Sequence, residues 1–288
     1  MAHLHLGRLT SMQGDFTAGQ SGVARSLQLL QELGDRVESA WALNWLGWTA
    51  RERGDATTAR VHLEASLAIF RDLGDKFLVC GATNTLAETC ILQGDLSLAK
   101  TLLDDNLALG RQLEDSGSIA WALNHLGQIA LQQGEHEQSI RLQMESLSLF
   151  DKMGAHNEGT IWTQEGLGET ALAQSEAIAA ATHFTEALLL AQDLGERAAT
   201  AWCLAGLAGV AALNEEPERA AWLWGAAEAL RQSIGVREAP ASHATHQRLR
   251  AMAQEQIGQA AYAAQWAAGS VASPSDAIER ALLFEQDR

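Results

Sequence analysis

Two sets of side chains in this sequence have types and spacings that could do chemistry. Glu165 and Glu169 are four residues apart, so both carboxylates would share one helix face, as paired-carboxylate catalysis requires. Acidic residues at this spacing are also common on solvated helix faces. His243 and His246 are three residues apart, but no cysteine or acidic residue nearby in the sequence completes a metal site. We therefore expect no catalytic residues and no metal site, and we interpret the histidines as surface or packing residues.

Other sequence signatures of enzymes are absent. The chain has no nucleophile elbow, no Cys–His nucleophile arrangement and no glycine-rich dinucleotide fingerprint. Cys80, Cys90 and Cys203 lack metal-ligand spacing and fit packing roles in a reducing compartment. We expect a protein that is not an enzyme, uses no cofactor and works by binding.

The elements that must position any binding residues repeat along the chain. Blocks that end helices, such as Leu33-Gly34-Asp35, recur six times with a regular period of about 40 residues. A second series, beginning with Gly14-Asp15, falls midway between them. Glycine accepts the left-handed conformation that ends a helix, and aspartate caps the next one. The pattern predicts six antiparallel helix pairs, with helices of about 18 residues, or roughly 27 Å.

Four of the repeats carry a tryptophan followed by a leucine, a small residue and an alanine, as Trp41, Leu46, Gly47 and Ala50 do before the Gly54-Asp55 corner. This pattern resembles the tetratricopeptide repeat over residues 1–236. The period exceeds the usual one of about 34 residues, and is similar to the long-helix repeats of bacterial signalling proteins. The resemblance implies an all-α fold, a right-handed α-solenoid of six antiparallel helix pairs. The first repeat is truncated, because Met1 falls within its first helix. We therefore expect the chain to be excised from a longer protein.

A helical capping segment is expected at residues 237–288, because the periodic pattern stops after Gly235. This part resembles the C-terminal end of bacterial LuxR-type or predicted-ATPase transcriptional regulators, in which an NTPase module precedes the repeats. No phosphate loop or basic recognition helix is present, so those activities do not carry over. The resemblance rests on residues 218–221, 225–231, 258–262 and 267–269.

The charge and hydropathy of the chain limit its partners. A net charge of −16 and a pI near 4.9 argue against direct nucleic-acid binding, which needs clustered basic residues. The longest apolar run, residues 201–213, is too short to span a bilayer, and no signal-peptide pattern begins the chain. We expect a cytoplasmic protein with no membrane contact.

The resemblance also predicts a binding surface, because the first helix of each tetratricopeptide pair lines the concave face. Asn44, Asn84 and Asn124 share one position and would form a ladder of amides. These amides could bind a peptide backbone or a small polar ligand, with tryptophans stacking beside them. Alternatively, the asparagines could fix the register between repeats while the tryptophans pack. The candidate inner-face residues are Trp41, Asn44, Trp48, Arg51, Asn84, Glu88, Trp121, Asn124, Gln128, Trp162, Glu165, Glu169 and Trp202.

Three functions fit these observations. The first is a non-catalytic scaffold that binds a protein or peptide segment in the concave groove, as the repeat region of a bacterial signalling or transcriptional regulator. The second is a sensor domain for a small polar ligand in the same groove. The third is a spacer or lock acting on an upstream NTPase or regulatory domain.

Overall fold

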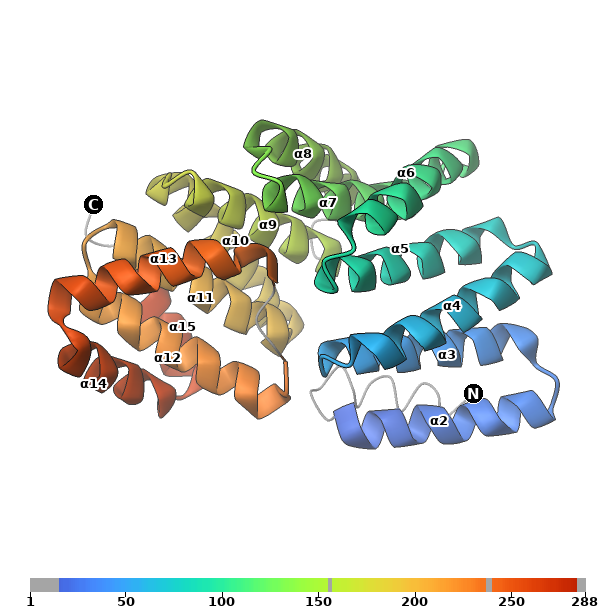
Figure 1. Cartoon of the computed structure of the whole chain (residues 1–288), viewed down its shortest axis with the longest axis horizontal. Helices are drawn as coiled ribbons and strands as arrows, with labels where there is room; N and C mark the ends of the chain where they lie inside the picture. The colour runs from blue at the N-terminus through green and yellow to red at the C-terminus, as the bar shows by residue number, and fades with distance from the viewer. Residues whose placement is uncertain (1–15, 155–156, 237–239, 284–288) are drawn as a thin grey trace. The chain divides into compact units, whose positions relative to one another are not determined.

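The computed structural model describes residues 16–154, 157–236 and 240–283, and these residues form helices without any β-strand (Figure 1). The expected all-α fold of consecutive helix pairs is confirmed. The first helix expected in the first pair falls on residues 1–15, outside the described residues. The described helices are α2 (Phe16–Glu32), α3 (Arg36–Glu52), α4 (Ala56–Leu73), α5 (Lys76–Leu92), α6 (Leu96–Leu113), α7 (Ser116–Gln132), α8 (His136–Met153), α9 (Glu158–Ala173), α10 (Ala177–Leu194), α11 (Arg197–Leu213), α12 (Pro217–Ile234), α13 (Pro240–Ile257), α14 (Gln259–Ser270) and α15 (Pro274–Leu282).

The corners between helices have the geometry that the repeating blocks predict. Gly34 ends α2 with a φ of 71°, and the Asp35 carboxylate then accepts the backbone N–H of Glu38 at the start of α3. Because the left-handed conformation strains residues with a Cβ, glycine suits this position best. The period still holds where glycine is absent: Glu114 and Ser175 turn their corners at φ values of 56° and 62°.

The chain divides into two compact units. Unit 1 comprises residues 1–129 together with 234–237, and unit 2 comprises residues 130–233 together with 238–288. Each unit is described by itself below. The predicted boundary at residue 236 adjoins residues outside the described ranges and stays a prediction.

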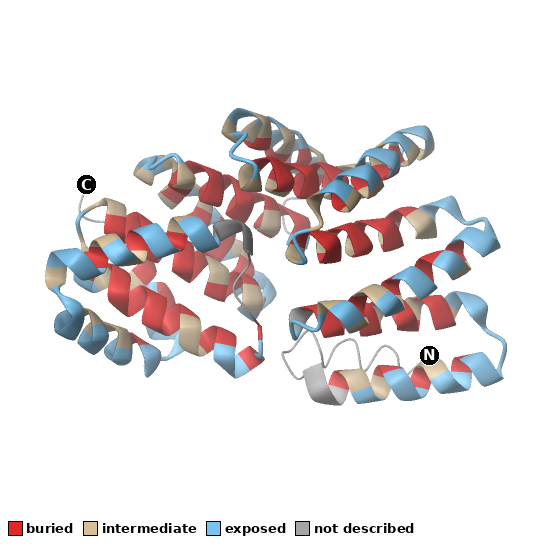
Figure 2. Ribbon diagram, viewed as in Figure 1, coloured by how far each residue is buried: buried red, intermediate tan, exposed pale blue. Residues whose placement is uncertain are grey.

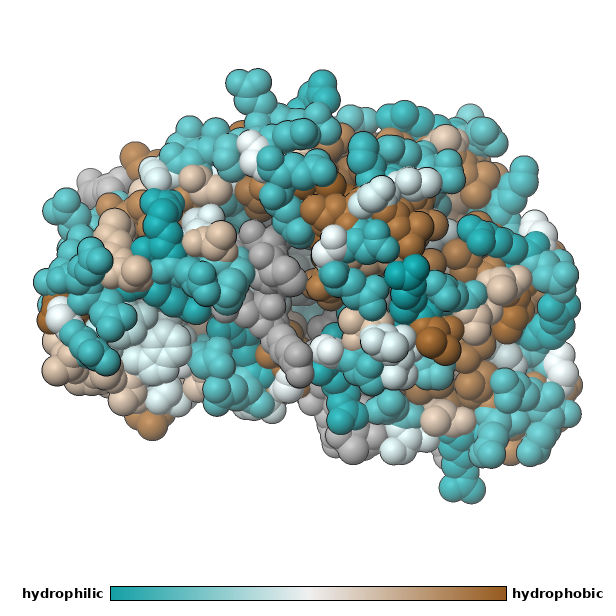
Figure 3. All heavy atoms as spheres, viewed as in Figure 1, coloured by the Kyte–Doolittle hydropathy of each residue, from teal (hydrophilic) through white to brown (hydrophobic). Residues whose placement is uncertain are grey.

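Unit 1 is built from neighbouring helices that pack in sequence order. Helix α2 packs on α3, α3 on α4, α4 on α5 and α5 on α6. Buried residues lie on the sides of the helices that face one another (Figure 2). Gly47 on α3 allows this approach, because a Cβ there would lie 2.5 Å from the Leu63 side chain of α4. At the surface of this unit, apolar and hydrophilic side chains interleave (Figure 3).

Unit 2 contains a continuous core in which Phe184 of α10 is fully buried. Its ring lies against two first helices, because added Cβ atoms at Gly168 of α9 and Gly206 of α11 would be 2.9 Å and 2.3 Å from it. The small residues that the period places on first helices therefore make room for a large side chain from the second helix.

Helices α13 to α15 close unit 2. Helices α12 and α14 cross with their backbones in contact: a Cβ on Gly225 would lie 2.1 Å from the Trp266 carbonyl oxygen, and one on Gly269 would lie 1.9 Å from that of Trp222. Helix α15 packs on α11, and the Arg219 guanidinium donates to the carbonyl of Arg280 at its end. Two residues of the regulator-like sequence, Gly225 and Gly269, thus form a helix crossing.

Helix α13 continues the repeat register, although the sequence pattern led us to expect the periodicity to stop after Gly235. It packs on α11 and also reaches α9, so it lies against two first helices. His246 stands one full period after Gly206, and Trp224 stands one full period after Phe184. The rings of Trp224 and His246 meet edge to face at 6.4 Å, where Phe184 contacts Gly206 one repeat earlier. The sequence signal was missed because the Gly-Asp corner is lost here.

Candidate functional site

An ion pair joins two of the candidate inner-face residues in unit 1. The guanidinium of Arg51, on α3, binds the carboxylate of Glu88, on α5. The Arg51 side chain is only 6% exposed, whereas that of Glu88 is 32% exposed. Because α3 and α5 are first helices of consecutive pairs and pack together, the pair crosses the boundary between repeats. Solvent and a ligand can therefore reach Glu88 more readily than Arg51.

His125 on α7 lies close to this ion pair, next in sequence to the predicted Asn124. Its imidazole Nδ1 is 3.5 Å from the Gln128 side-chain oxygen, and its ring stacks on that of Trp121 at 5.7 Å. Burial lowers the pKa of His125, although Glu88 and Gln128 act in the opposite direction. The imidazole is therefore neutral at neutral pH and serves as a hydrogen-bonding group.

Half-buried tryptophans complete this surface. Trp45 and Trp48 on α3 contact each other edge to face at 5.3 Å, and Trp41 meets the buried ring of Phe70 at the same distance. Each indole thus packs on one side and keeps part of its surface exposed, which is typical of residues that anchor a partner. We call the following set the unit 1 wall: Trp45, Trp48, Arg51, Glu88, Trp121, His125 and Gln128.

The predicted asparagines are buried. Asn84 accepts a hydrogen bond from Asn106 Nδ2 at 2.9 Å and donates to the Ser118 carbonyl at 3.4 Å, so its amide links α5 to α6 and α7. Asn44 is 7% exposed and Asn124 is fully buried. Burial favours the second interpretation given above, in which these amides hold repeats in register. A role for them in ligand binding stays a prediction.

In unit 2 the two candidate glutamates on α9 are buried, and one of them contacts α13. Glu165 and Glu169 on α9 are 8% and 4% exposed, and the Glu169 carboxylate is 2.9 Å from Nε2 of His246. The Trp224 indole N–H donates to the other imidazole nitrogen, Nδ1, at 3.3 Å. A side chain of the capping segment thus occupies the place where the sequence predicted ligand contacts.

Two groups in this buried cluster have raised pKa values. Burial raises the pKa of Glu165 well above its ordinary value, and the neighbouring Glu169 carboxylate raises it further. Burial also raises the pKa of Cys203 well above its ordinary value, assisted by both carboxylates. The Cys203 thiol therefore stays protonated at neutral pH, and protonated thiols are poor nucleophiles.

Small residues on α11 allow α13 to reach past it to α9. Ala205 and Gly209 occupy the period positions of Glu165 and Glu169. A Cβ on Gly209 would lie 2.7 Å from Leu172 of α9 and 3.2 Å from Leu249 of α13, so side chains from both helices meet above this glycine. The remaining predicted tryptophans, Trp162 and Trp202, are half-buried, and Trp162 donates to Glu158 at 3.3 Å.

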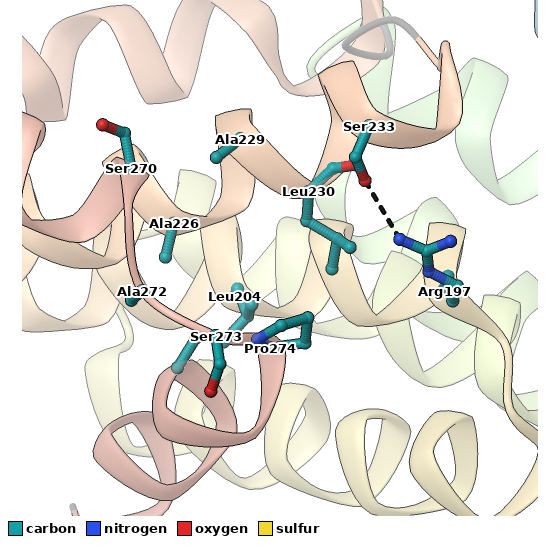
Figure 4. A pocket seen from close by; sticks show the side chains of 11 residues that line it. Arg197, Leu204, Ala226, Ala229, Leu230, Ser233, Ser270, Ala272, Ser273 and Pro274 are labelled. Atoms are coloured by element: carbon teal, nitrogen blue, oxygen red, sulfur yellow. Dashed lines mark hydrogen bonds between the residues drawn. The ribbon is translucent and has the colours of Figure 1, made fainter.

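A cavity of about 290 Å³ lies between α11, α12 and the connection from α14 to α15 (Figure 4). Its lining consists mainly of alanines, leucines and serines, and Arg197 at its edge donates to Ser233 Oγ at 3.0 Å. No candidate inner-face residue lines this cavity. Within the described residues, no helix is both long and apolar enough to cross a bilayer, and no three metal-binding side chains cluster.

Sequence reasoning missed several residues of these two sites. It did not single out Trp45 or His125, although each follows a predicted asparagine by one residue. It also missed the partnership of His246 with Glu169, because 77 residues separate them. Of the predicted residues, Trp48, Arg51, Glu88, Trp121 and Gln128 belong to the unit 1 wall, and Glu165 and Glu169 lie near one another in unit 2.

Comparison with known proteins gives a consistent picture of the fold. Residues 1–72 and 78–152, just over half of the chain, match a family described as tetratricopeptide repeat. No curated protein matches the sequence. Among solved structures, BtubC (BKLC) from P. vanneervenii is similar with a TM-score of 0.57 and 18% identity, over 77% of this chain and 93% of that one.

Two further solved structures are regulators by description. The Rap conjugation gene regulator of plasmid pLS20, in complex with the Phr* peptide, has a TM-score of 0.64 and 12% identity, over 89% of this chain and 76% of that one. A signal transduction ATPase with a tetratricopeptide repeat sensor, from Pyrococcus horikoshii, has a TM-score of 0.53 and 15% identity. It covers 99% of this chain, which spans 42% of that protein. At these identities the likeness concerns the fold.

Proposed function

Because the chain belongs to the tetratricopeptide repeat family, we propose that it is a non-catalytic scaffold that binds a peptide segment of another protein through the unit 1 wall. The observation that carries this proposal is the wall itself. Partly exposed indoles lie on α3 and α7, and the exposed carboxylate of the Arg51–Glu88 pair lies on α5 between them. Aromatic side chains and arginines that are packed on one side are the usual anchors of protein interfaces.

The corresponding first-helix positions of unit 2 support placing the peptide on unit 1. There, Glu165 and Glu169 are covered, and His246 of α13 binds Glu169. An incoming peptide would have to displace a buried, hydrogen-bonded side chain at this place. At the unit 1 wall, Glu88 and the indoles of Trp48 and Trp121 keep exposed surface.

The comparisons support a regulatory setting for this scaffold. The Rap regulator of pLS20 was solved in complex with a peptide, and the Pyrococcus horikoshii protein combines a repeat sensor with an ATPase. By analogy we place this chain in the repeat region of a bacterial signalling or transcriptional regulator. An upstream NTPase domain, a cytoplasmic location and a lack of direct nucleic-acid contact belong to the same proposal.

Selection of peptides on the intact chain tests the proposed function. A phage-displayed library of random peptides is panned against the immobilised protein, and the most enriched peptide is synthesised for calorimetric titration. Replacing Glu88 with Gln or Trp48 with Ala should weaken its binding at least tenfold, because each substitution removes an anchor worth roughly 1.4 kcal/mol or more.

A charge-matched control separates a local effect from a general one. Glu64, on the second helix α4, also pairs with one arginine and is 53% exposed, so Glu64→Gln removes the same charge away from the wall. This control should bind like the wild type, and thermal unfolding should show that all variants are folded. Enrichment of no peptide, or equal binding by Glu88→Gln, Trp48→Ala and wild type, would contradict the proposal. A shift in melting temperature caused by a polar metabolite, together with no peptide binding, would favour the sensor function instead.

A further inference from the structure

Gly81 stands at a position where neighbouring repeats carry tryptophan. The residues at this position of α3, α5 and α7 are Trp41, Gly81 and Trp121. Gly81 lies inside α5 with ordinary helical geometry, since it is not among the residues with positive φ. A glycine inside a helix destabilises it relative to alanine. Its presence here therefore calls for a cause in packing or in function.

Packing does not require the glycine. A Cβ on Gly81 would meet no atom within 4 Å, so open space lies beside it. Other glycines inside helices of the same chain differ: a Cβ on Gly47 would lie 2.5 Å from Leu63, and one on Gly166 would lie 2.5 Å from Gln143. Those two glycines admit a neighbouring side chain, whereas Gly81 admits nothing from the chain itself.

Aromatic residues occur one helical turn before Gly81 on its own helix and at the equivalent position of the neighbouring first helices. Phe77 precedes it by one helical turn on the same face of α5 and is 56% exposed. Trp41 and Trp121 occupy the same position on the neighbouring first helices, and both are half-buried. An exposed phenylalanine forfeits the free energy of burial, so a ring that covers it on binding would recover that free energy. Across α3, α5 and α7, the aromatic residue at this position is missing at Gly81.

We propose that the space over Gly81, between Trp41 and Trp121, is a slot that receives an aromatic side chain of the bound peptide. This inference rests on the proposed function and specifies one residue class of the bound peptide; Gly81 lies two helical turns before Glu88 of the unit 1 wall, on the same helix. The incoming ring completes the row of aromatic residues at the spacing of the first helices and covers Phe77. Aromatic pairs gain free energy beyond that of area burial alone, which favours phenylalanine, tyrosine or tryptophan over leucine.

The test fills the slot with the residue that the neighbouring repeats carry. Peptides selected from the phage-displayed random library on the wild-type protein should share one aromatic position. Gly81→Trp should weaken binding of the leading peptide at least tenfold without lowering the melting temperature, because its side chain enters open space. Gly81→Ala is the matched control: it should raise the melting temperature and keep the affinity within about twofold, since one methyl group leaves most of the slot open.

A second measurement leaves the protein unchanged. Replacing the shared aromatic residue of the peptide with leucine should weaken binding to the wild-type chain by about 2- to 12-fold, the contribution expected of an aromatic pair. Unchanged affinity of both Gly81→Trp and the leucine peptide would overturn the slot. If Glu88→Gln still weakened binding in that case, the proposed function would stand without it. Failure of the library to yield any binder would overturn both.

Discussion

His246 on α13 donates its Nε2 proton to the Glu169 carboxylate on α9, 2.9 Å away, although helices α10, α11 and α12 separate these two helices in the sequence. The direction of this bond follows from Trp224, whose indole nitrogen can only donate and therefore makes Nδ1 the acceptor. This hydrogen-bonding pattern places the imidazole proton on Nε2. One buried histidine consequently links α9, α12 and α13.

The buried carboxyl of Glu165 should make the stability of the protein depend on pH. Burial raises its pKa in the folded state, so folding favours the protonated form. Its contribution to stability is present below the ordinary pKa of 4.5 and is lost as pH rises from there through the raised folded value. Glu165→Gln keeps the shape without the charge. We expect its free energy of unfolding to exceed that of the wild type increasingly from about pH 5 to about pH 8 in urea titrations.

An exposed carboxylate provides the control for this pH effect. Glu279 on α15 is exposed, and Glu279→Gln should leave the pH dependence of the wild type unchanged. If Glu165→Gln were more stable than the wild type by the same free energy of unfolding at about pH 5 and about pH 8, folding would not raise the pKa of Glu165.

Leu249 should be essential for holding α13 in place. Its side chain is fully buried and approaches Gly209 of α11. Leu249→Ala leaves a cavity and should lower the free energy of unfolding by about 2–5 kcal/mol in urea titrations. Leu189→Ala removes the same atoms from a residue that is 46% exposed, and should change stability by less than about 0.5 kcal/mol. Similar losses for both variants would refute the packing of α13 described here.

Introducing at Ser66 of α4 the asparagine that α6 carries at the equivalent position should stabilise unit 1. In one repeat Asn106 bonds both Asn84 and the Cys80 carbonyl, but its counterpart one period earlier is Ser66, which reaches only the Ala40 carbonyl. The buried Asn44 amide nitrogen is a donor without a partner among the described residues, and the side-chain oxygen of an asparagine at position 66 would supply the acceptor.

Ser66→Asn should therefore raise the free energy of unfolding by about 1 kcal/mol, the usual net gain from one buried hydrogen bond. The converse change, Asn106→Ser, should lower it by about 1–3 kcal/mol by leaving the Asn84 oxygen unpaired. Chemical denaturation of both variants measures whether the first change raises the free energy of unfolding and the second lowers it. A loss of stability in Ser66→Asn would mean that the second repeat lacks room for the larger side chain.

The crossing of α12 and α14 should not tolerate a methyl group. A Cβ on Gly225 would lie 2.1 Å from a backbone oxygen, which cannot move aside as a side chain can. Gly225→Ala should therefore destabilise the protein by about 1–3 kcal/mol or more, as overpacking does. Thermal unfolding should show a lower melting temperature for both Gly225→Ala and Gly225→Ser, since serine adds a similar Cβ. An unchanged melting temperature in either would argue against backbone contact at this crossing.

The sequence was sufficient to predict the helices, because the signals that end them are local. Gly34 and Asp35 act on their own backbone, and the regular period located corners even at Glu114 and Ser175, where no glycine is present. The tight contact at Gly47 could also be anticipated, since small residues recur at that position. These features depend on interactions within one repeat or between neighbouring repeats.

The site was less predictable, because its contacts join residues far apart in the chain. His246 was judged to lack an acidic partner, and the sequence near it contains none; Glu169 comes from two first helices earlier. Glu165 and Glu169 have the spacing of a solvated pair, but both are buried, and His246 of α13 contacts Glu169. Asn84 reaches the next repeat through the Ser118 carbonyl on α7, but its other partner, Asn106, lies on the second helix of its own pair, which the sequence pattern did not indicate.

The reach of His246 past α11 limits the length of the array. Helix α11, which carries the small residues Ala205 and Gly209, packs on both α9 and α13. Inserting another helix pair before α13 would carry the imidazole beyond Glu169, while deleting α11 and α12 would remove Trp224. Natural variation in repeat number should therefore occur upstream of α9, where adding or losing a pair leaves this bond intact.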